Sequence, residues 1–194
     1  MRIFGIDPGS ERTGYGCVES DGRRHVLVTC GAVAAPPGDT LPNRLARIHS
    51  ELSVLLASCR PDCVAIENLF HAANVRSALK LGHARGVAML AAVEAGCDVV
   101  EYTPAEIKRA VVGYGRAEKP QVQQMVKILL GLGSVPSPHD AADALAVAIC
   151  HVHAQVPARA IGAVQPARSR ATSWRTYRPA SAPVALRRGK PAGS

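Results

Sequence analysis

The chain has 194 residues, of which 47% are hydrophobic, and a formal net charge of +8 at pH 7. This length and apolar content allow one substantial core. The N-terminus lacks the apolar run of a signal peptide, and no uncharged stretch is apolar enough to cross a membrane, so a cytoplasmic protein is expected. Cys59 and Cys63 have no second Cys or His pair at zinc spacing, and the six cysteines are expected to be reduced, packed thiols.

The positive charge is concentrated at the C-terminal end. Residues 155–194 contain eight Arg or Lys and no Asp or Glu, which leaves 15 of the 23 basic residues to balance the 15 acidic residues of 1–154. The segment is rich in Pro, Ala, Arg and Ser and has no hydrophobic periodicity, so we predict a folded domain over 1–154 and a disordered tail over 155–194. Such a tail suits nucleic acid, and a solubilising extension is the alternative.

The first half of the chain predicts an antiparallel three-stranded unit, then a helix and a fourth strand. The expected elements are strands over 2–7, 13–19 and 25–34, a helix over 41–58 and a strand over 62–67. Pro8-Gly9 stops the first strand, and Asp21-Gly22 is a hairpin signal between the next two. Apolar residues follow the 3.6-residue period through the helix. The fourth strand is apolar between two acidic ends and is predicted to be buried on both faces.

The second half predicts helices that alternate with one more strand. The expected elements are a helix over 74–95, a strand over 98–102, and helices over 104–113, 120–130 and 137–152. Thr103 and Glu106 form a capping box at the start of the second of these helices. Ser137 is the predicted N-cap of the last helix, with Pro138 at its first position. These elements predict an α/β fold in which a mixed five-stranded sheet has helices on both faces.

Four acidic residues occupy positions where an unpaired carboxylate would be unfavourable. Asp7 and Glu67 each end an apolar strand, and Asp140 and Asp143 lie on one face of an alanine-rich helix. Asp140 alone could be a capping acid and Asp7 a turn residue, but Glu67 has no such role in a buried strand. Like charges about 4 Å apart repel by roughly 4 kcal/mol at an effective dielectric near 20. The acids therefore predict a site for hard divalent cations such as a pair of Mg²⁺ ions.

The order of several motifs resembles that of the RuvC family, the bacterial Holliday-junction resolvases. The motifs are residues 5–10, 13–14, 66–70, 74–82, 111–119 and 140–145, and the resemblance covers about residues 1–153. It implies a ribonuclease-H-like fold and a homodimer with one active site per subunit. It also implies Mg²⁺-dependent cutting of two strands of like polarity across a four-way DNA junction, with two ions per subunit, Mn²⁺ as a substitute, and RuvA and RuvB as branch-migration partners.

The resemblance also assigns roles to individual residues. It implies that the four acids are the metal ligands and that Lys108 and Lys119 lie near the scissile phosphate. Phe70 matches an aromatic residue that packs into the opened junction centre, although a core position would be its ordinary use. The expected DNA contacts are Phe70, Asn74, Arg76, Lys80, Arg85, Tyr114 and Arg116. The chain departs from the family by carrying His71 and Ala73 in the loop after Phe70, and His139 could support Asp140 or be a solvated residue.

Three further points remain open from the residues. Gly82 and Gly86 allow the helix over 74–95 to pack closely, either on the sheet or on a partner chain. A module that binds junctions without cutting them would keep the fold but lose an acid, and none is lost. An actin-like phosphotransferase would share the Asp-Pro-Gly-Ser loop, but it needs two related subdomains and a second nucleotide loop, for which the chain is too short.

Overall fold

The computed structural model describes residues 1–68 and 74–155, so residues 69–73 and nearly all of the predicted tail, 156–194, lie outside the described residues. The elements are strands β1 (Arg2–Asp7), β2 (Arg12–Ser20), β3 (His25–Ala34), β4 (Cys63–Glu67) and β5 (Asp98–Tyr102), and helices α1 (Leu41–Cys59), α2 (Val75–Glu94), α3 (Pro104–Val112), α4 (Lys119–Leu129) and α5 (His139–Gln155). The predicted order of strands and helices is confirmed.

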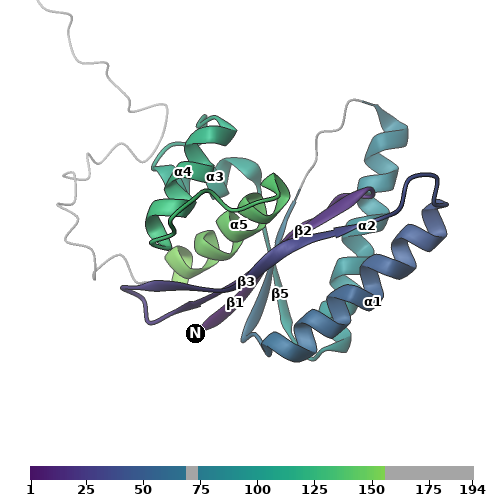
Figure 1. Ribbon diagram of the computed structural model, residues 1–194, viewed down its shortest axis with the longest axis horizontal. Coiled ribbons are helices and arrows are strands. Elements are labelled where there is room, and N and C mark those ends of the chain that lie inside the picture. The colour runs from purple at the N-terminus through teal and green to yellow at the C-terminus, as the bar shows by residue number, and fades with distance from the viewer. Residues whose placement is uncertain (69–73, 156–194) are drawn as a thin grey trace, which may run out of the picture. The chain divides into compact units, whose positions relative to one another are not determined.

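The sheet brings the ends of two distant strands together. Its order is β3-β2-β1-β4-β5, with β1 antiparallel to β2 and parallel to β4 (Figure 1). Ile6 pairs with Ile66 across the parallel strands. Because parallel strands end at the same edge of a sheet, the residues that follow this pair, Asp7 and Glu67, lie side by side.

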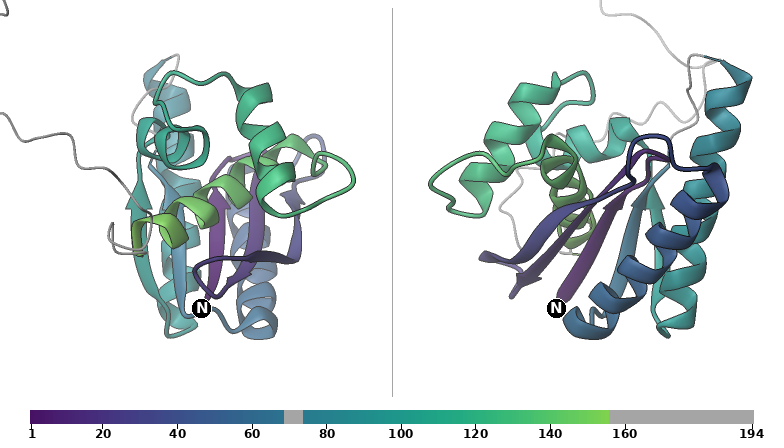
Figure 2. Two further views of the ribbon diagram at one scale, coloured as in Figure 1. Left: turned by 90° about the vertical axis from the view of Figure 1, so that its left-hand side faces the viewer. Right: turned by 45° about the vertical axis from the view of Figure 1, so that its right-hand side comes forward.

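Helices cover both faces of the sheet, as predicted. Helices α1 and α2 pack on one face and α3, α4 and α5 on the other (Figures 1 and 2). Side chains alternate along β1, because Ile3 packs with α5 whereas Phe4 and Ile6 pack with α1 and α2. By the same alternation Asp7 and Glu67 belong to the α5 face.

Helix α5 lies directly against β1 and β2 because three strand positions beneath it are glycines. A Cβ on Gly5 would overlap the backbone carbonyl oxygen of Ala144, and a Cβ on Gly14 would overlap that of Asp140. Gly16 likewise has no room for a side chain under the helix. This close approach places the first turns of α5 over the end of β1.

The start of α5 differs from the sequence prediction. The helix begins at His139, so the predicted N-cap at Ser137 and first helical position at Pro138 were wrong. The Ser137–Pro138 peptide bond is cis, and the Ala141 N–H donates to the Pro138 carbonyl at 3.0 Å. A backbone bond of this span is a tight 3₁₀-type turn, so the main chain closes the first turn in place of a serine side chain.

Helix α2 shows which way its glycines face. A Cβ on Gly82 or Gly86 would meet nothing within 4 Å, whereas Ala84, Ala88 and Ala91 of the same helix are fully buried. The glycines therefore point away from the sheet, and packing on the sheet was the wrong one of the two alternatives. No helix in the described part of the chain has the length and apolar character needed to cross a bilayer.

Candidate active site

The turn after β1 fixes the position of Asp7. The Thr13 hydroxyl, fully buried, donates to the Gly9 carbonyl at 2.8 Å and accepts from the Gly9 N–H at 3.4 Å. These bonds hold the chain as it leaves β1 and returns into β2, where Asp7 pairs with Gly14. The Asp-Pro-Gly-Ser segment thus serves as the turn that ends the strand at the acid.

Asp7 and Glu67 form a closely interacting acid pair at the shared strand edge. Their carboxyl groups are close enough for each to affect the pKa of the other. Burial raises the pKa of Glu67 above its ordinary value, and the nearby charge of Asp7 raises it further. Burial also raises the pKa of Asp7, and the charges of Asp143 and Asp140 act in the same direction. The pair therefore stands in a field of negative charge that favours a proton or a cation.

The two acids of α5 each contact a basic side chain. Lys119 Nζ lies 3.0 Å from Asp143 Oδ2, and this carboxylate raises the pKa of the lysine. Asp143 is 15% exposed whereas Lys119 is 75% exposed, so the lysine reaches the buried acid from the surface. Arg12 Nε lies 3.6 Å from Asp140 Oδ2 on the other side of the helix start. The charges of Asp143, Lys119 and Asp140 all affect the pKa of Asp7, so the acids lie in one region where β1, β4 and α5 converge.

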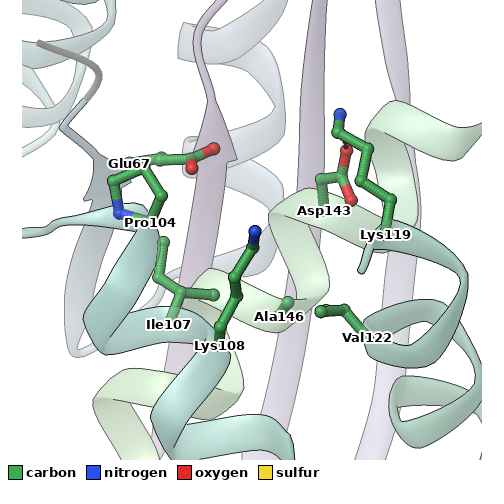
Figure 3. A pocket seen from close by; sticks show the side chains of 8 residues that line it. All are labelled: Glu67, Pro104, Ile107, Lys108, Lys119, Val122, Asp143 and Ala146. Carbon is green, nitrogen blue, oxygen red and sulfur yellow. Dashed lines mark hydrogen bonds and ion pairs between the residues drawn. The ribbon is translucent and has the colours of Figure 1, made fainter. Parts of the chain in front are cut away.

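A small pocket opens between the strand edge and the helices that cover it. Its volume is about 60 Å³. It is lined by Glu67, Pro104, Ile107, Lys108, Lys119, Val122, Asp143 and Ala146 (Figure 3). The ammonium of Lys108 points toward the space between the carboxylates of Glu67 and Asp143 (Figure 3). Acidic and basic side chains therefore share one cleft with an apolar floor, in which charge interactions are stronger than in open water.

Local sequence explains why the two lysines reach this cleft. The predicted capping box is confirmed, since Thr103 and Glu106 bond reciprocally and fix the start of α3, which carries Lys108. Helix α4 begins at Lys119, and Gln121 Oε1 accepts from the Tyr114 hydroxyl at 2.9 Å and from the Glu118 N–H. Tyr114 therefore holds the loop before α4 against the helix that begins with Lys119.

The predicted DNA contacts do not all have the same surroundings. Asn74 accepts from the Ser77 N–H at 2.9 Å and caps α2, and Arg85 forms an ion pair with Glu101 of β5. Arg76 and Arg116 are exposed. Lys80 is half-buried, and Phe70, His71 and Ala73 lie outside the described residues. The roles of these residues in DNA binding stay predictions.

The donor atoms suit a hard divalent cation, because carboxylate oxygens are the ligands that such ions prefer. The placement of Asp7 and Glu67 also fits, since burial raises the pKa of both carboxyl groups and a bound cation would stabilise their charged forms. As placed in residues 1–68 and 74–155, no three acidic, His or Cys side chains are close enough together to hold one ion. The carboxylates of Asp140 and Asp143 instead lie on Arg12 and Lys119.

Sequence reasoning missed Arg12. It begins β2 and is 128 positions away from its partner Asp140 along the chain. No local pattern distinguishes it from any other arginine next to a turn, because the contact depends on how α5 crosses β2. The sequence around Gly5, Gly14 and Gly16, which allow this crossing, does not indicate that a helix packs on them.

The sheet order, the parallel pairing of β1 with β4, and acids at those strand ends and on the covering helix define the ribonuclease-H-like class. Comparisons with known proteins specify the family within this class. A family model described as "Crossover junction endodeoxyribonuclease RuvC" matches residues 3–151. The crossover junction endodeoxyribonuclease RuvC of Trichlorobacter lovleyi is 53% identical over 180 residues, which cover 92% of this chain and 100% of that protein.

Two further relatives agree with this assignment. The protein of the same description from Koribacter versatilis is 56% identical over 154 residues, covering 79% of this chain and 93% of its own. The structure of Thermus thermophilus RuvC in complex with a Holliday junction substrate matches with a TM-score of 0.76 and 37% identity, over 79% of this chain and 94% of that chain. The chain belongs to the RuvC family of crossover junction endodeoxyribonucleases.

Proposed function

We propose that this protein resolves Holliday junctions in DNA recombination and repair, by hydrolysing phosphodiester bonds in two strands of like polarity. The observation that carries this function is the convergence of Asp7, Glu67, Asp140 and Asp143 at one sheet edge in a chain of the RuvC family. Support for the substrate comes from the Thermus thermophilus relative, which was solved with a Holliday junction. A junction-binding module that does not cut would have no use for this set of acids.

Nucleases of this family depend on a metal ion. We infer that the metal is Mg²⁺, with two ions per subunit and Mn²⁺ as a substitute, and that the four acids hold it. Bound metal would mask the negative charge of the phosphodiester, activate a water molecule and stabilise the departing 3′ oxygen. The choice of Mg²⁺ follows from the all-oxygen donor set.

Lys119 and Lys108 supply positive charge from the chain itself. Lys119 is exposed except at its ammonium contact with Asp143, so it can exchange this carboxylate for a phosphate oxygen at little cost in burial. Lys108 points into the same cleft from α3 (Figure 3). Both lysines act as point charges that orient the phosphate and stabilise the negative charge that develops on it. Arg76, Lys80 and Arg116 are proposed phosphate contacts farther along the DNA.

The outer face of α2 supports a homodimer. Val75, Leu79, Leu90 and Val93 are between 51% and 77% exposed. Together with Gly82 and Gly86 they follow one another at steps of three or four residues, which puts all six on one stripe opposite the buried alanines. Exposed apolar side chains beside glycines form a surface on which a second helix can approach closely. Two copies joined along this stripe would carry two active sites, one for each strand to be cut.

The remaining proposals concern partners and segments outside the described residues. RuvA and RuvB are proposed branch-migration partners, as the family resemblance implies. Phe70 is proposed to stack on bases at the opened junction centre, where stacking contributes roughly 1 to 3 kcal/mol per base. The basic tail is proposed to add nonspecific DNA affinity by releasing counterions.

The deciding experiment incubates the purified protein with a mobile four-way junction, with and without Mg²⁺. The expected result is a pair of symmetrical nicks that require the metal, with linear duplex left intact. Binding of the junction without nicks at any Mg²⁺ concentration would instead identify a non-cutting scaffold. Mn²⁺ in place of Mg²⁺ is expected to support the same nicks, and Ca²⁺ serves as a control that binds oxygen ligands with a looser geometry.

A further inference from the structure

Two histidines from opposite ends of the described chain face each other far from the acids. His25 begins β3 and His153 lies in the last turn of α5, and their Nε2 atoms are 3.2 Å apart. The ring centroids are 5.2 Å apart with a tilt of 52°, so the rings meet edge to edge and do not stack. His153 is ten residues after Asp143, roughly 15 Å along the helix. The pair is therefore separate from the active site.

Each ring is oriented through its other nitrogen. His153 Nδ1 lies 2.9 Å from the Ala110 carbonyl oxygen, and His25 Nδ1 lies 2.9 Å from Ser20 Oγ. A carbonyl can only accept, so His153 carries its proton on Nδ1 and presents a lone pair on Nε2. Ser20 Oγ also accepts from the Gly22 N–H at 3.0 Å, which fixes the serine. Histidines that bind metals are held in this way by a second partner on the opposite nitrogen.

The separation of the two Nε2 atoms matches that of two ligands on one ion. Nitrogens about 2.0 to 2.1 Å from a tetrahedral Zn²⁺ ion are roughly 3.3 Å apart. We propose that His25 and His153 form a binding site for a borderline transition-metal ion such as Zn²⁺, in which the ion takes the place of the proton between the two Nε2 atoms. On binding, the proton of His25 moves from Nε2 to Nδ1, and the Ser20 hydroxyl changes from donor to acceptor.

The surroundings suit an open site of this kind. Burial, and then the neighbouring His153, lower the pKa of His25 and so favour the neutral form that binds metals. Asp21 in the β2–β3 turn acts in the opposite direction on His25. On the α3 side, a cavity of about 310 Å³ is lined by His153, Glu106 and Arg109 among others. No third His, Cys, Asp or Glu in residues 1–68 and 74–155 completes the site, so water molecules are its remaining ligands.

The site differs in chemistry from the acidic cleft. Imidazole nitrogens select Zn²⁺, Cu²⁺ or Ni²⁺, whereas the carboxylates select Mg²⁺, so both ions can be bound at once. An ion between His25 and His153 would tie the β2–β3 hairpin to α5, and through Ala110 to α3. Binding to the folded state alone raises the unfolding temperature as the metal concentration rises.

The test titrates Zn²⁺ into the full-length protein in excess Mg²⁺, followed by calorimetry and by thermal unfolding. The wild type is expected to bind one Zn²⁺ and to unfold at a higher temperature when the ion is bound. His25→Asn is expected to show neither effect. Ser20→Ala should weaken the same step about tenfold, because it removes the partner that orients His25. His83→Asn, a change at an exposed histidine of α2, is the matched control and should bind as the wild type does.

Two results would overturn the site. If His25→Asn binds Zn²⁺ with unchanged stoichiometry and affinity, the ion binds elsewhere, for example at cysteines or at the acids. If the wild type binds no more Zn²⁺ than His25→Asn does, the two histidines share a proton and do not bind the metal. Circular dichroism and Mg²⁺-dependent junction cleavage of His25→Asn should equal those of the wild type, which shows that the variant is folded.

Discussion

The two faces of the sheet are packed by different means. On the α5 face, glycines in β1 and β2 let a helix backbone lie on the strands, and the acids gather where that helix begins. On the other face, larger side chains such as Phe4, Leu52 and Leu56 fill the space beneath α1 and α2, and α2 keeps a second apolar side exposed. The two faces are therefore expected to have different functions. Close backbone contact brings the acids of α5 over those of the sheet, whereas the outer face of α2 is the surface proposed to bind a second subunit.

The sharpest test of the α5 face removes one charge from its acids. Asp7→Asn and Asp143→Asn should each lower the cleavage rate by about 1000-fold, because a bound cation contributes several kcal/mol of transition-state stabilisation and the amide no longer holds it. Junction binding should persist or tighten, since less negative charge then faces the phosphates. Single-turnover cleavage and gel-shift assays measure the two effects.

The control for this test lies on the opposite face. Glu51 of α1 forms an ion pair with Arg47 on the helix surface, and Glu51→Gln should leave cleavage unchanged. Full activity in Asp7→Asn would separate the acids from the chemistry and leave the α5 face with a purely structural role.

The corresponding test of the other face puts charge on the outer stripe of α2. The double change Leu79→Glu and Leu90→Glu should raise the dimer dissociation constant by at least about 100-fold, because burying each leucine contributes roughly 1.5 to 3 kcal/mol. Sedimentation velocity should then show a folded monomer, and paired nicking of junctions should be lost. Ile128→Glu on α4, where the isoleucine is 65% exposed, is the matched control. A dimer that survives the double change would place the interface elsewhere.

A smaller effect is expected from adding a side chain to the strand beneath α5. Gly5→Ala places a methyl group on the Ala144 carbonyl and should lower the free energy of unfolding by about 1 to 3 kcal/mol as the helix moves away. Because α5 carries the acids, cleavage should fall as well. Gly133→Ala, at a position where a Cβ meets nothing within 4 Å, should change neither. Chemical denaturation and cleavage rates together test whether the close contact of Gly5 with Ala144 is needed to position the acids of α5.

The smallest expected effect concerns pH and again the α5 face. His151 is buried, contacts the Tyr102 hydroxyl at 3.0 Å, and has its pKa lowered by burial. A lowered pKa means that the unfolded chain binds the proton more readily, so stability is present above the ordinary histidine pKa and is lost as pH falls below it. Denaturation midpoints measured from neutral to mildly acidic pH should decline less steeply in His151→Gln than in the wild type. An unchanged slope would assign the acid sensitivity to other groups.

The sequence predicted the sheet better than the contacts between its layers. Strand ends at Asp7 and Glu67 and the capping box at Thr103 depend on neighbours within a few residues, and all three lie where expected. The ion pair of Arg12 with Asp140 depends on how a helix crosses a strand, which no local pattern encodes. Ser137 fails as a cap for a related reason, because the backbone itself closes the first turn of α5.

The gathering of acids was predictable only in part. Apolar runs that end in an acid point to a shared strand edge, and this led to Asp7 and Glu67. The contacts of the α5 acids with Lys119 and Arg12 were not foreseen, although the family resemblance placed Lys119 near the site. The direction of Gly82 and Gly86 was equally undecided, since a helix with apolar residues on two sides gives no indication of which side faces the core.

The order in which the chain is made has a consequence for when it can cut. Asp7 is near the start of the domain, whereas Asp140 and Asp143 belong to the last helix, which crosses β1 and β2. A ribosome releases these segments in that order, and early parts of a chain can begin to fold before later ones emerge. A nascent chain with a finished sheet would still lack Asp140 and Asp143, two of the four proposed metal ligands. If the four acids act together as proposed, we expect a chain to cut DNA only after α5 has docked, and a product that ends before α5 to be inactive.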